Sequence, residues 1–440
     1  MKKRKGSPSA AAEPTLLKSP ESDRSSLSYE AVFVVIMIAL IFILYWLWIC
    51  ITYRSGLLWI PDSPDQIGSY FARFWDFIKQ GAIPSRFAIV VYLGWVVSHA
   101  FGQIYLSGKT VKGLPMRGQN GKQLKYTMNG WKAFWLMWII LFGFHQSRIL
   151  PITVFYDLCG ELMTVSFAFS SLLSLWLFLF PNDNSPTTRS ISGFWFGRDL
   201  NPRFRGFDWK LFCEARPGLP LWAVLNVSTC VKQYETFGSV SSSMLLITFM
   251  QFWYVVDYFW NEEAILSTMD IMTDHFGFML CFGDLAWVPF TYTIQTRFLC
   301  SMDSLHEASP LLLAASFIIF VVGFIVFRSS NSQKHNFRMN PSKHQKKGTF
   351  IETKSGSRLL ISGWWGWVRH ANYLGDIMMG WSWSLPTGYS TLLAYFYPIY
   401  FTILVLHREY RDNVHCQKKY GDDWTRYCKI VPYRLIPYVY

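Results

Sequence analysis

One uninterrupted apolar stretch decides most about how this chain can fold. Residues 31–52 contain no charged side chain. A helix over this range, rising about 1.5 Å per residue, is long enough to cross the roughly 30 Å hydrocarbon core of a bilayer. The stretch is also too long to be the apolar region of a cleavable signal peptide. We therefore predict that residues 31–52 form a transmembrane helix.

The rest of the chain has the composition of further spans. Charged residues make up 16% of the 440 residues, against about 25% in soluble globular proteins, and hydrophobic residues make up 51%. So few charges cannot cover the surface of soluble domains of this size. The fold class predicted is all-α, a polytopic integral membrane protein with about ten transmembrane helices. The expected spans are 31–52, 87–106, 133–144, 162–180, 219–231, 240–260, 276–294, 310–327, 373–385 and 392–406.

The basic residues agree with this number of spans. The net charge of +13 would also suit a protein that binds nucleic acid or an anionic cofactor, but the lysines and arginines gather between the spans. The basic segments follow zero, two, four, eight and ten spans, so one orientation places all of them in the cytosol, as the positive-inside rule requires. We expect no direct contact with nucleic acid. These segments are the N-terminal tail, 109–132, 189–216, 328–369 and 408–434.

Two predictions concern domains and metals. Residues 1–30 are polar, basic and rich in Ser and Pro, which predicts a disordered tail in the cytosol or nucleoplasm before a membrane domain at 31–440. The eight cysteines include no CxxC pair, so neither a zinc site nor a disulfide framework is indicated.

Ionisable residues gather around the sixth and seventh spans, where burial in the membrane makes them costly and therefore candidates for function. On a helix, Tyr254 and Asp257 fall on one face, and Asp274 and His275 follow just before the next span. Each carboxylate taken alone is explained equally well by helix capping or by an ion pair with Arg or Lys. For the cluster as a whole we predict a polar-lipped cavity within the membrane.

A second pattern occupies the C-terminal third of the chain. Lys334 and Arg338 lie four residues apart on one helical face, and the segments 363–376 and 407–427 mix Lys, Arg, His and Asn with aromatic residues. Cations suit phosphate, aromatic faces suit adenine or nicotinamide, and Asp412 suits a ribose or an amide. Neither GxGxxG nor GxxxxGK[ST] is present to indicate a Rossmann or P-loop site. A topology signal or a contact with anionic lipid explains such a basic region as well.

Four long segments resemble the sterol reductase family, which includes the sterol C14-reductases, the 7-dehydrocholesterol reductases and the lamin B receptor. They are 193–222, 268–290, 359–376 and 407–440, and the resemblance extends over about 31–440. The motifs NSQKHNFR, TMDIMTDHFGFM and SGWWGWVRHANYLGD are similar to the branch of C14-reductases and the lamin B receptor. Ala371 stands where that branch commonly has Pro.

The resemblance implies a cofactor and a location. Members have about ten spans, reside in the endoplasmic reticulum or the inner nuclear membrane, and reduce a ring double bond of a sterol precursor with NADPH. The cofactor pocket would lie in the C-terminal half, about 309–440. The residues implied to bind NADPH are Lys334, Arg338, Leu360, Trp365, Asn372, Tyr373, Arg408, Asp412, Cys416, Gln417, Lys418, Lys419, Tyr420 and Tyr427.

The expected reaction is reduction of the double bond between carbons 14 and 15 in sterol biosynthesis. A proton must reach carbon 15 so that positive charge develops at carbon 14, where hydride is then accepted. Such an enzyme needs a proton donor beside the alkene and aromatic faces or negative charge near the cation. As hypotheses for these roles we take the following side chains: Tyr254, Asp257, Asp274, His275 and Tyr292.

Other functions remain open on the sequence alone. The same machinery could reduce a 7-dehydrosterol, or the chain could be a structural protein of the nuclear envelope in the manner of the lamin B receptor. The tail of 30 residues leaves no room for that receptor's chromatin-reading domain, and it does not indicate lamin or chromatin partners. Sterol and membrane lipid are therefore the expected partners. A transporter is a weaker alternative, because buried acids also serve ion coupling.

Overall fold

The computed structural model describes residues 27–114, 123–182, 189–339, 348–354 and 356–440. Most of the predicted disordered tail, residues 1–26, lies outside these ranges. Residues 27–30, which the sequence analysis assigns to the tail, instead begin the first helix, α1, Leu27–Arg54. Glu30 holds this end in place, because its carboxylate accepts hydrogen bonds from the backbone N–H and the hydroxyl of Ser192 at 2.7 and 2.6 Å.

Helices form most of the described chain. In the N-terminal part the helices after α1 are α2 Ile67–Gly81, α3 Arg86–Tyr105, α4 Gly130–Gln146, α5 Val154–Asp157, α6 Cys159–Leu179, α7 Ile191–Phe196, α8 Trp209–Ala215, α9 Gly218–Phe237 and α10 Ser242–Trp260. The following helices are α11 Met269–Met272, α12 Phe278–Phe282, α13 Val288–Thr291, α14 Ile294–Cys300, α15 Pro310–Met339, α16 Trp364–Trp367, α17 Ala371–Ser384, α18 Phe396–Tyr420 and α19 Asp422–Ile430.

Four of the described helices are long and apolar enough to cross a membrane by length and composition: α1, α3, α6 and α15. This finding supports a membrane protein of the helical class. The other six expected spans also coincide with helical segments, on α4, α9, α10, α12 to α14, α17 and α18. The longest of the helices outside the expected spans is α2. It is amphipathic and packs against α1 and α6.

The seventh expected span is a broken helix. Between α12 and α13 the backbone forms one π-helical turn at Gly283–Trp287, and α14 follows after a short break. The irregular backbone is held by neighbours: the Ser166 hydroxyl donates to the Leu285 carbonyl at 2.5 Å, and a Cβ on Gly218 would lie 1.9 Å from the Asp284 carbonyl oxygen. Such π-helical turns frequently occur at functional sites, and non-helical backbone at membrane depth is tolerated where it is buried in protein.

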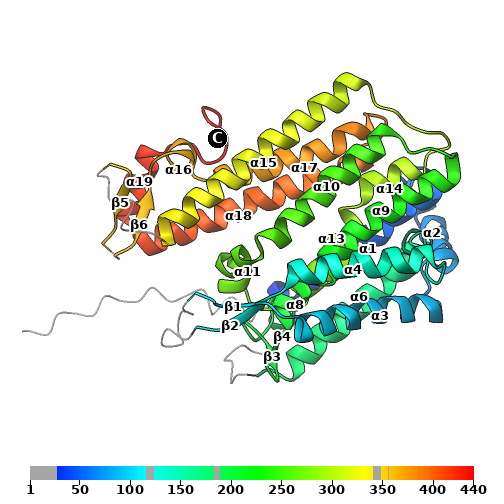
Figure 1. Cartoon of the computed structure of the whole chain (residues 1–440), viewed down its shortest axis with the longest axis horizontal. Coiled ribbons are helices and arrows are strands. Elements are labelled where there is room, and N and C mark those ends of the chain that lie inside the picture. The colour runs from blue at the N-terminus through cyan, green and yellow to red at the C-terminus, as the bar shows by residue number, and fades with distance from the viewer. Residues whose placement is uncertain (1–26, 115–122, 183–188, 340–347, 355) are drawn as a thin grey trace, which may run out of the picture.

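Figure 1 shows α15, α17 and α18 side by side, with α10 between this group and the helices of the N-terminal part. The contact between α15 and α17 is close because two glycines meet. A Cβ on Gly323 would lie 2.8 Å from the Gly375 carbonyl oxygen, and a Cβ on Gly375 would lie 2.5 Å from that of Gly323. Small residues of this kind let two membrane helices approach.

Most of the described chain is helical, as the all-α prediction expects, and a few short strands are present in addition. Three antiparallel two-stranded sheets lie in the connections: β1 Lys109–Lys112 with β2 Lys125–Met128, β3 Arg203–Phe204 with β4 Phe207–Asp208, and β5 Phe350–Glu352 with β6 Arg358–Leu360. The last of these sheets lies with α16 and α19 at the end of the molecule that α15 and α18 both reach (Figure 1). This end carries most of the residues predicted to bind cofactor.

Candidate active site

Tyr254 on α10 forms a pair with a carboxylate of a distant segment. Its hydroxyl donates to Asp376 Oδ1 at 3.2 Å, which joins α10 to α17 across 122 residues of sequence. Both side chains are partly buried. A tyrosine hydroxyl linked to a carboxyl group is the arrangement that a proton relay requires.

Aromatic rings surround this pair. The ring centroids of Trp222 and Trp383 lie 5.8 and 5.4 Å from that of Tyr254. Tyr292, another residue predicted to be catalytic, lies 5.1 Å from Trp222 and 4.4 Å from Tyr397. The structure thus brings Tyr254 and Tyr292 to the same aromatic cluster, from two helical segments that the sequence separates by the acidic connection.

Asp257, by contrast, is engaged elsewhere. Its carboxylate forms an ion pair with Arg328 on α15, with Nε 2.7 Å from both carboxylate oxygens, and the Asp257 side chain is 13% exposed. Asp257 therefore ties α10 to α15, while Asp376 is the carboxylate at the Tyr254 hydroxyl. The sequence analysis paired Tyr254 with Asp257 because both lie on one face of α10, and it overlooked Asp376.

The two remaining catalytic candidates lie in the connection after α10. Asp274 pairs with Arg411 of α18 at 3.3 Å, and its backbone carbonyl accepts a hydrogen bond from Lys210 at 2.5 Å. The side chain of His275 reaches the surface of the molecule. Burial of part of the ring and the nearby positive charge of Lys210 lower its pKa. The structure does not join either residue to the Tyr254 hydroxyl. Asp270 forms a second ion pair, with Arg408 at 3.3 Å, so two ion pairs link this connection to α18.

The predicted cofactor residues converge at the extended end of α15 and α18. The ammonium of Lys334 lies 3.9 Å from the ring centroid of Trp365, close enough for a cation–π interaction. Asp412 and Cys416 lie within electrostatic reach of the same ammonium group. Arg338 is exposed one helical turn further on. Lysine and arginine on this face are suited to phosphate groups.

Two more of these residues, Asn372 and Tyr373, lie where α17 begins, beside His370, which the sequence analysis did not name. The rings of His370 and Tyr373 stack at 4.9 Å with an 8° angle between their planes. His370 Nε2 lies 3.9 Å from Asp412 Oδ2, too far for a hydrogen bond. Burial and the positive charges of Lys334, Arg369 and Arg434 lower the pKa of His370 to about 3, so the ring is neutral.

This group contains polar atoms that a ligand could satisfy. Among the described residues, Asn372 Oδ1 and His370 Nε2 are buried and have no hydrogen-bond partner. Unpaired buried polar atoms are rare and call for an explanation. Next to stacked rings, cations and the carboxylate of Asp412, they fit the amide, ribose and phosphate groups of a nicotinamide dinucleotide.

Some of the remaining predicted cofactor residues belong to, or pack against, an apolar cluster between α19 and β5. Ile351, Trp424, Tyr427 and Val431 form its buried centre, and Cys416 and Tyr420 pack against it. Leu360 is the last residue of β6, partly buried and paired with Phe350. Three side chains on the same turn of α18 are exposed and lie outside the cluster: Gln417, Lys418 and Lys419.

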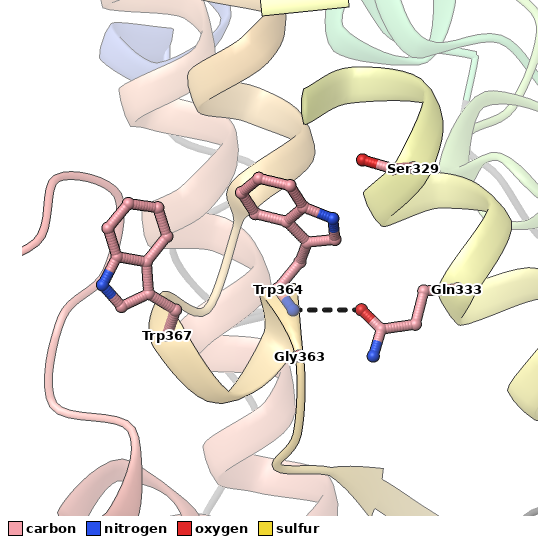
Figure 2. A pocket seen from close by; sticks show the side chains of 5 residues that line it. All are labelled: Ser329, Gln333, Gly363, Trp364 and Trp367. Atoms are coloured by element: carbon pink, nitrogen blue, oxygen red, sulfur yellow. Dashed lines mark hydrogen bonds between the residues drawn. The ribbon is translucent and has the colours of Figure 1, made fainter. Parts of the chain in front are cut away.

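Beside this region lies a groove of about 520 Å³, whose walls are formed by α15 and α16. Figure 2 shows Trp364 and Trp367 on one side of it and Ser329 and Gln333 on the other. Gln333 bridges the two walls, because its Nε2 donates to the Ser362 carbonyl at 3.0 Å and its Oε1 accepts from the Trp364 N–H at 3.1 Å. Gln333 therefore fixes the turn that precedes Trp365.

Sequence reasoning missed Asp376, Arg328 and Gln333. Asp376 is an ionisable residue inside the apolar ninth segment, so the rule that singled out the acids around the seventh span would also have found it. The roles of Arg328 and Gln333 have no such signal, because each depends on a contact with a distant segment.

The apolar helices and the enclosed polar site define this chain as a helical integral membrane protein. The profile of the ergosterol biosynthesis ERG4/ERG24 family matches residues 24–440, and the chain belongs to that family. It is 42% identical to a delta(14)-sterol reductase of Dictyostelium discoideum, over 90% of this chain and 87% of the relative. It is 41% identical to a delta(14)-sterol reductase of Methylotuvimicrobium alcaliphilum, over 92% and 94%.

A third relative is longer than this chain. The delta(14)-sterol reductase LBR of Gallus gallus is 43% identical over 79% of this chain but only 55% of its own length. The family membership predicted from the four sequence segments is thereby confirmed.

Proposed function

We propose that this protein is a delta(14)-sterol reductase that uses NADPH to reduce the double bond between carbons 14 and 15 of a sterol precursor. The observation that carries this proposal is the Tyr254–Asp376 pair inside an aromatic enclosure, which is joined through α17 to the group of residues around Tyr373. When bound, the cofactor supplies hydride. All other requirements of the reaction fall to side chains of this chain.

Tyr254 is the proposed proton donor to carbon 15. Its hydroxyl is the polar group that faces the aromatic enclosure, and Asp376 lies behind it at 3.2 Å. For this transfer the hydrogen bond between the two residues would reverse: the phenolic proton turns from Asp376 Oδ1 to carbon 15, and a carboxylic acid at Asp376 donates its proton to the phenolic oxygen, so that no phenolate accumulates. A positioned proton donor of this type typically contributes 10²- to 10⁴-fold to the rate.

The aromatic rings are proposed to stabilise the positive charge at carbon 14. Trp222 is in ring contact with Tyr254, Trp383 and Tyr292, Trp383 is also in ring contact with Tyr254, and Trp222 and Trp383 are buried. Ring faces attract a nearby cation by about 2 kcal/mol or more when water is excluded. The same apolar walls would accept the flat sterol skeleton and keep water from the carbocation.

The C-terminal site is proposed to hold the NADPH. Lys334 and Arg338 would bind phosphate groups, with Arg338 the better placed for the 2′-phosphate because it is exposed. Asn372 and the neutral His370 would meet polar groups of the cofactor, and Tyr373 would support a ring. Tyr373 and Asp376 lie one turn apart on α17, so cofactor and proton donor would be positioned by one helix.

The ten spans and the location are also proposals. Six helical segments besides the four long apolar helices coincide with the expected spans, and the basic segments alternate in the manner of the positive-inside rule. We propose ten spans in the endoplasmic reticulum membrane or the continuous inner nuclear membrane. Sterol would reach the site from the lipid.

The test is a competition between two substrates. The protein, purified in mild detergent, is given NADPH and an equal mixture of a 14-unsaturated sterol and a 7-dehydrosterol, and the products are identified by mass spectrometry. Loss of the 14–15 double bond alone is expected. Reduction at carbon 7 would overturn the regiochemistry, and NADPH binding without turnover would point to a structural role.

A further inference from the structure

Two buried polar groups near the cytosolic end of α10 have no role in the site described so far. In the described chain neither Tyr258 Oη nor Glu214 Oε2 has a hydrogen-bond partner, although both atoms are buried. Tyr258 packs against the cluster that contains Leu211 and Ala215 of α8, which lie three residues before and one residue after Glu214. Glu214 also lies within electrostatic reach of the Tyr258 hydroxyl. The two unpaired groups therefore lie in the same region, between α8 and the end of α10.

The other buried charges at the same level are held in an ion pair, although Arg216 Nε and Nη1 and Glu262 Oε1 have no hydrogen-bond partner among the described residues. Arg216 and Glu262 form an ion pair, and both side chains are almost completely buried. Arg216 also donates to Asn129 Oδ1 at 3.0 Å, and the Gly130 N–H donates to Glu262 at 2.9 Å. Arg216 and Glu262 offset each other's charge, whereas Glu214 Oε2 and Tyr258 Oη have neither an ion pair nor a hydrogen bond among the described residues. These two atoms leave one donor and one acceptor for a ligand.

Their electrostatic surroundings suit a neutral ligand. Burial, together with the carboxyl groups of Asp270 and Asp284, raises the pKa of Glu214, and the charges of Lys210 and Arg408 oppose this rise. A cation site would require a charged carboxylate and several ligands, but the described residues contain no group of His, Cys, Asp and Glu arranged to hold a metal. A hydroxyl group can donate to one side chain and accept from the other, whichever form Glu214 takes.

The position along α10 relates this pair to the proton donor. Tyr254 and Tyr258 are one turn apart on the same side of the helix, about 6 Å along its axis. A sterol carries a hydroxyl on its first ring, while carbon 14 lies at the far side of the fused rings. A sterol with carbon 14 beside Tyr254 therefore needs a polar site displaced along α10, toward one end of the membrane.

From this geometry we infer that Glu214 and Tyr258 bind the 3β-hydroxyl of the substrate, with Tyr258 donating a hydrogen bond to the sterol oxygen and Glu214 accepting a hydrogen bond from the sterol hydroxyl. This inference rests on the proposed function, and it adds how the substrate is oriented. The first ring would face the cytosolic end of α10 and the side chain would extend toward the opposite end. The hydroxyl site then determines which ring double bond lies beside Tyr254.

The experiment compares two substrates in three variants. A 14-unsaturated 3β-hydroxysterol and its 3-deoxy analogue are given separately to the wild-type protein, to Tyr258→Phe and to Glu214→Gln, and kcat/KM is measured for each pair. A site that binds a hydroxyl rejects an analogue without it, because its own polar groups then stay unpaired. We expect the wild type to prefer the hydroxysterol by about 100-fold, about tenfold for each of the two hydrogen bonds, and each variant to reduce this preference by about tenfold.

The matched control is Thr248→Val. The Thr248 hydroxyl is also buried and unpaired among the described residues and lies on α10, six residues before Tyr254. This variant should keep the wild-type preference. Equal turnover of both sterols by the wild type, or an unchanged preference in both site variants, would overturn the hydroxyl site alone. No turnover of either sterol by the wild type would instead overturn the proposed function.

Discussion

The two halves of the proposed site differ in how the chain builds them. The interior half, around Tyr254, brings together side chains from α9, α10, α13, α17 and α18, and its central hydrogen bond joins residues 122 positions apart. The cofactor half, around Lys334, draws almost all its residues from the last 110 positions. The interior half consists mainly of neutral aromatic rings, and the cofactor half carries the cations. Chemistry and cofactor binding should therefore respond separately to mutation.

The largest effect is expected at Tyr254. Tyr254→Phe removes the hydroxyl that donates to Asp376 and leaves the ring among Trp222 and Trp383. We expect kcat to fall by about 10²- to 10⁴-fold because the proton donor is lost, while the KM for NADPH stays within about twofold of wild type. Steady-state kinetics with a 14-unsaturated sterol measure both constants.

Asp376→Asn is the partner of this test, since it keeps the size of the side chain and removes the carboxyl group. Its kcat should also fall, and the double variant should be little worse than Tyr254→Phe, because the two residues act as a unit. Near wild-type turnover in Tyr254→Phe would remove this tyrosine from the mechanism.

The second effect belongs to the cofactor half. Lys334→Ala and Arg338→Ala should raise the KM for NADPH by about tenfold or more, in line with about 1.5–3 kcal/mol for a hydrogen bond to a charged group, and should leave the KM for sterol nearly unchanged. Arg338→Ala should in addition reduce the preference for NADPH over NADH. Equal rises in both KM values would indicate a defect of folding instead.

A smaller effect is expected at Gln333, which touches neither proposed substrate. Gln333→Ala removes both hydrogen bonds to the turn at Ser362 and Trp364, and with them about 1–2 kcal/mol of local stabilisation. Because this turn positions Trp365, the KM for NADPH should rise a few-fold with kcat unchanged. Ser329→Ala, in the same groove, is the control and should leave both constants as they are.

The smallest effect on turnover is expected of His370, whose influence is on stability at acidic pH. His370 has a pKa of about 3 in the folded protein and about 6.5 when unfolded, so the unfolded state takes up the proton first. The difference in pKa leaves the free energy of unfolding unchanged above about pH 6.5. Below that value the free energy of unfolding falls, by about 2 kcal/mol at pH 5. Thermal unfolding in detergent at pH 7.5 and pH 5 measures the loss.

The variant His370→Phe, which keeps a ring that can stack on Tyr373, should show a smaller difference between the two pH values. An identical difference in the wild type and the variant would show that other groups cause the acid sensitivity.

The sequence by itself determined the helical membrane class and the family. Uncharged stretches such as 31–52 have no stable alternative to a helix within lipid, and the positive-inside rule orders the loops. It also predicted that the residues proposed to bind the cofactor gather in one region, because they are close in sequence and several of them lie on single turns of α15 and α18. Family resemblance supplied their expected role, which remains to be tested.

Tertiary structure alone decided which groups meet. The sequence placed Asp257 beside Tyr254, whereas packing gave Asp257 to Arg328 and brought Asp376 to the tyrosine hydroxyl. It also added the small sheets in the loops and broke the seventh span at Gly283–Trp287. The physical reason is that helical periodicity fixes only which residues share a face. The partner of that face depends on how α10, α15 and α17 pack, which no local pattern encodes.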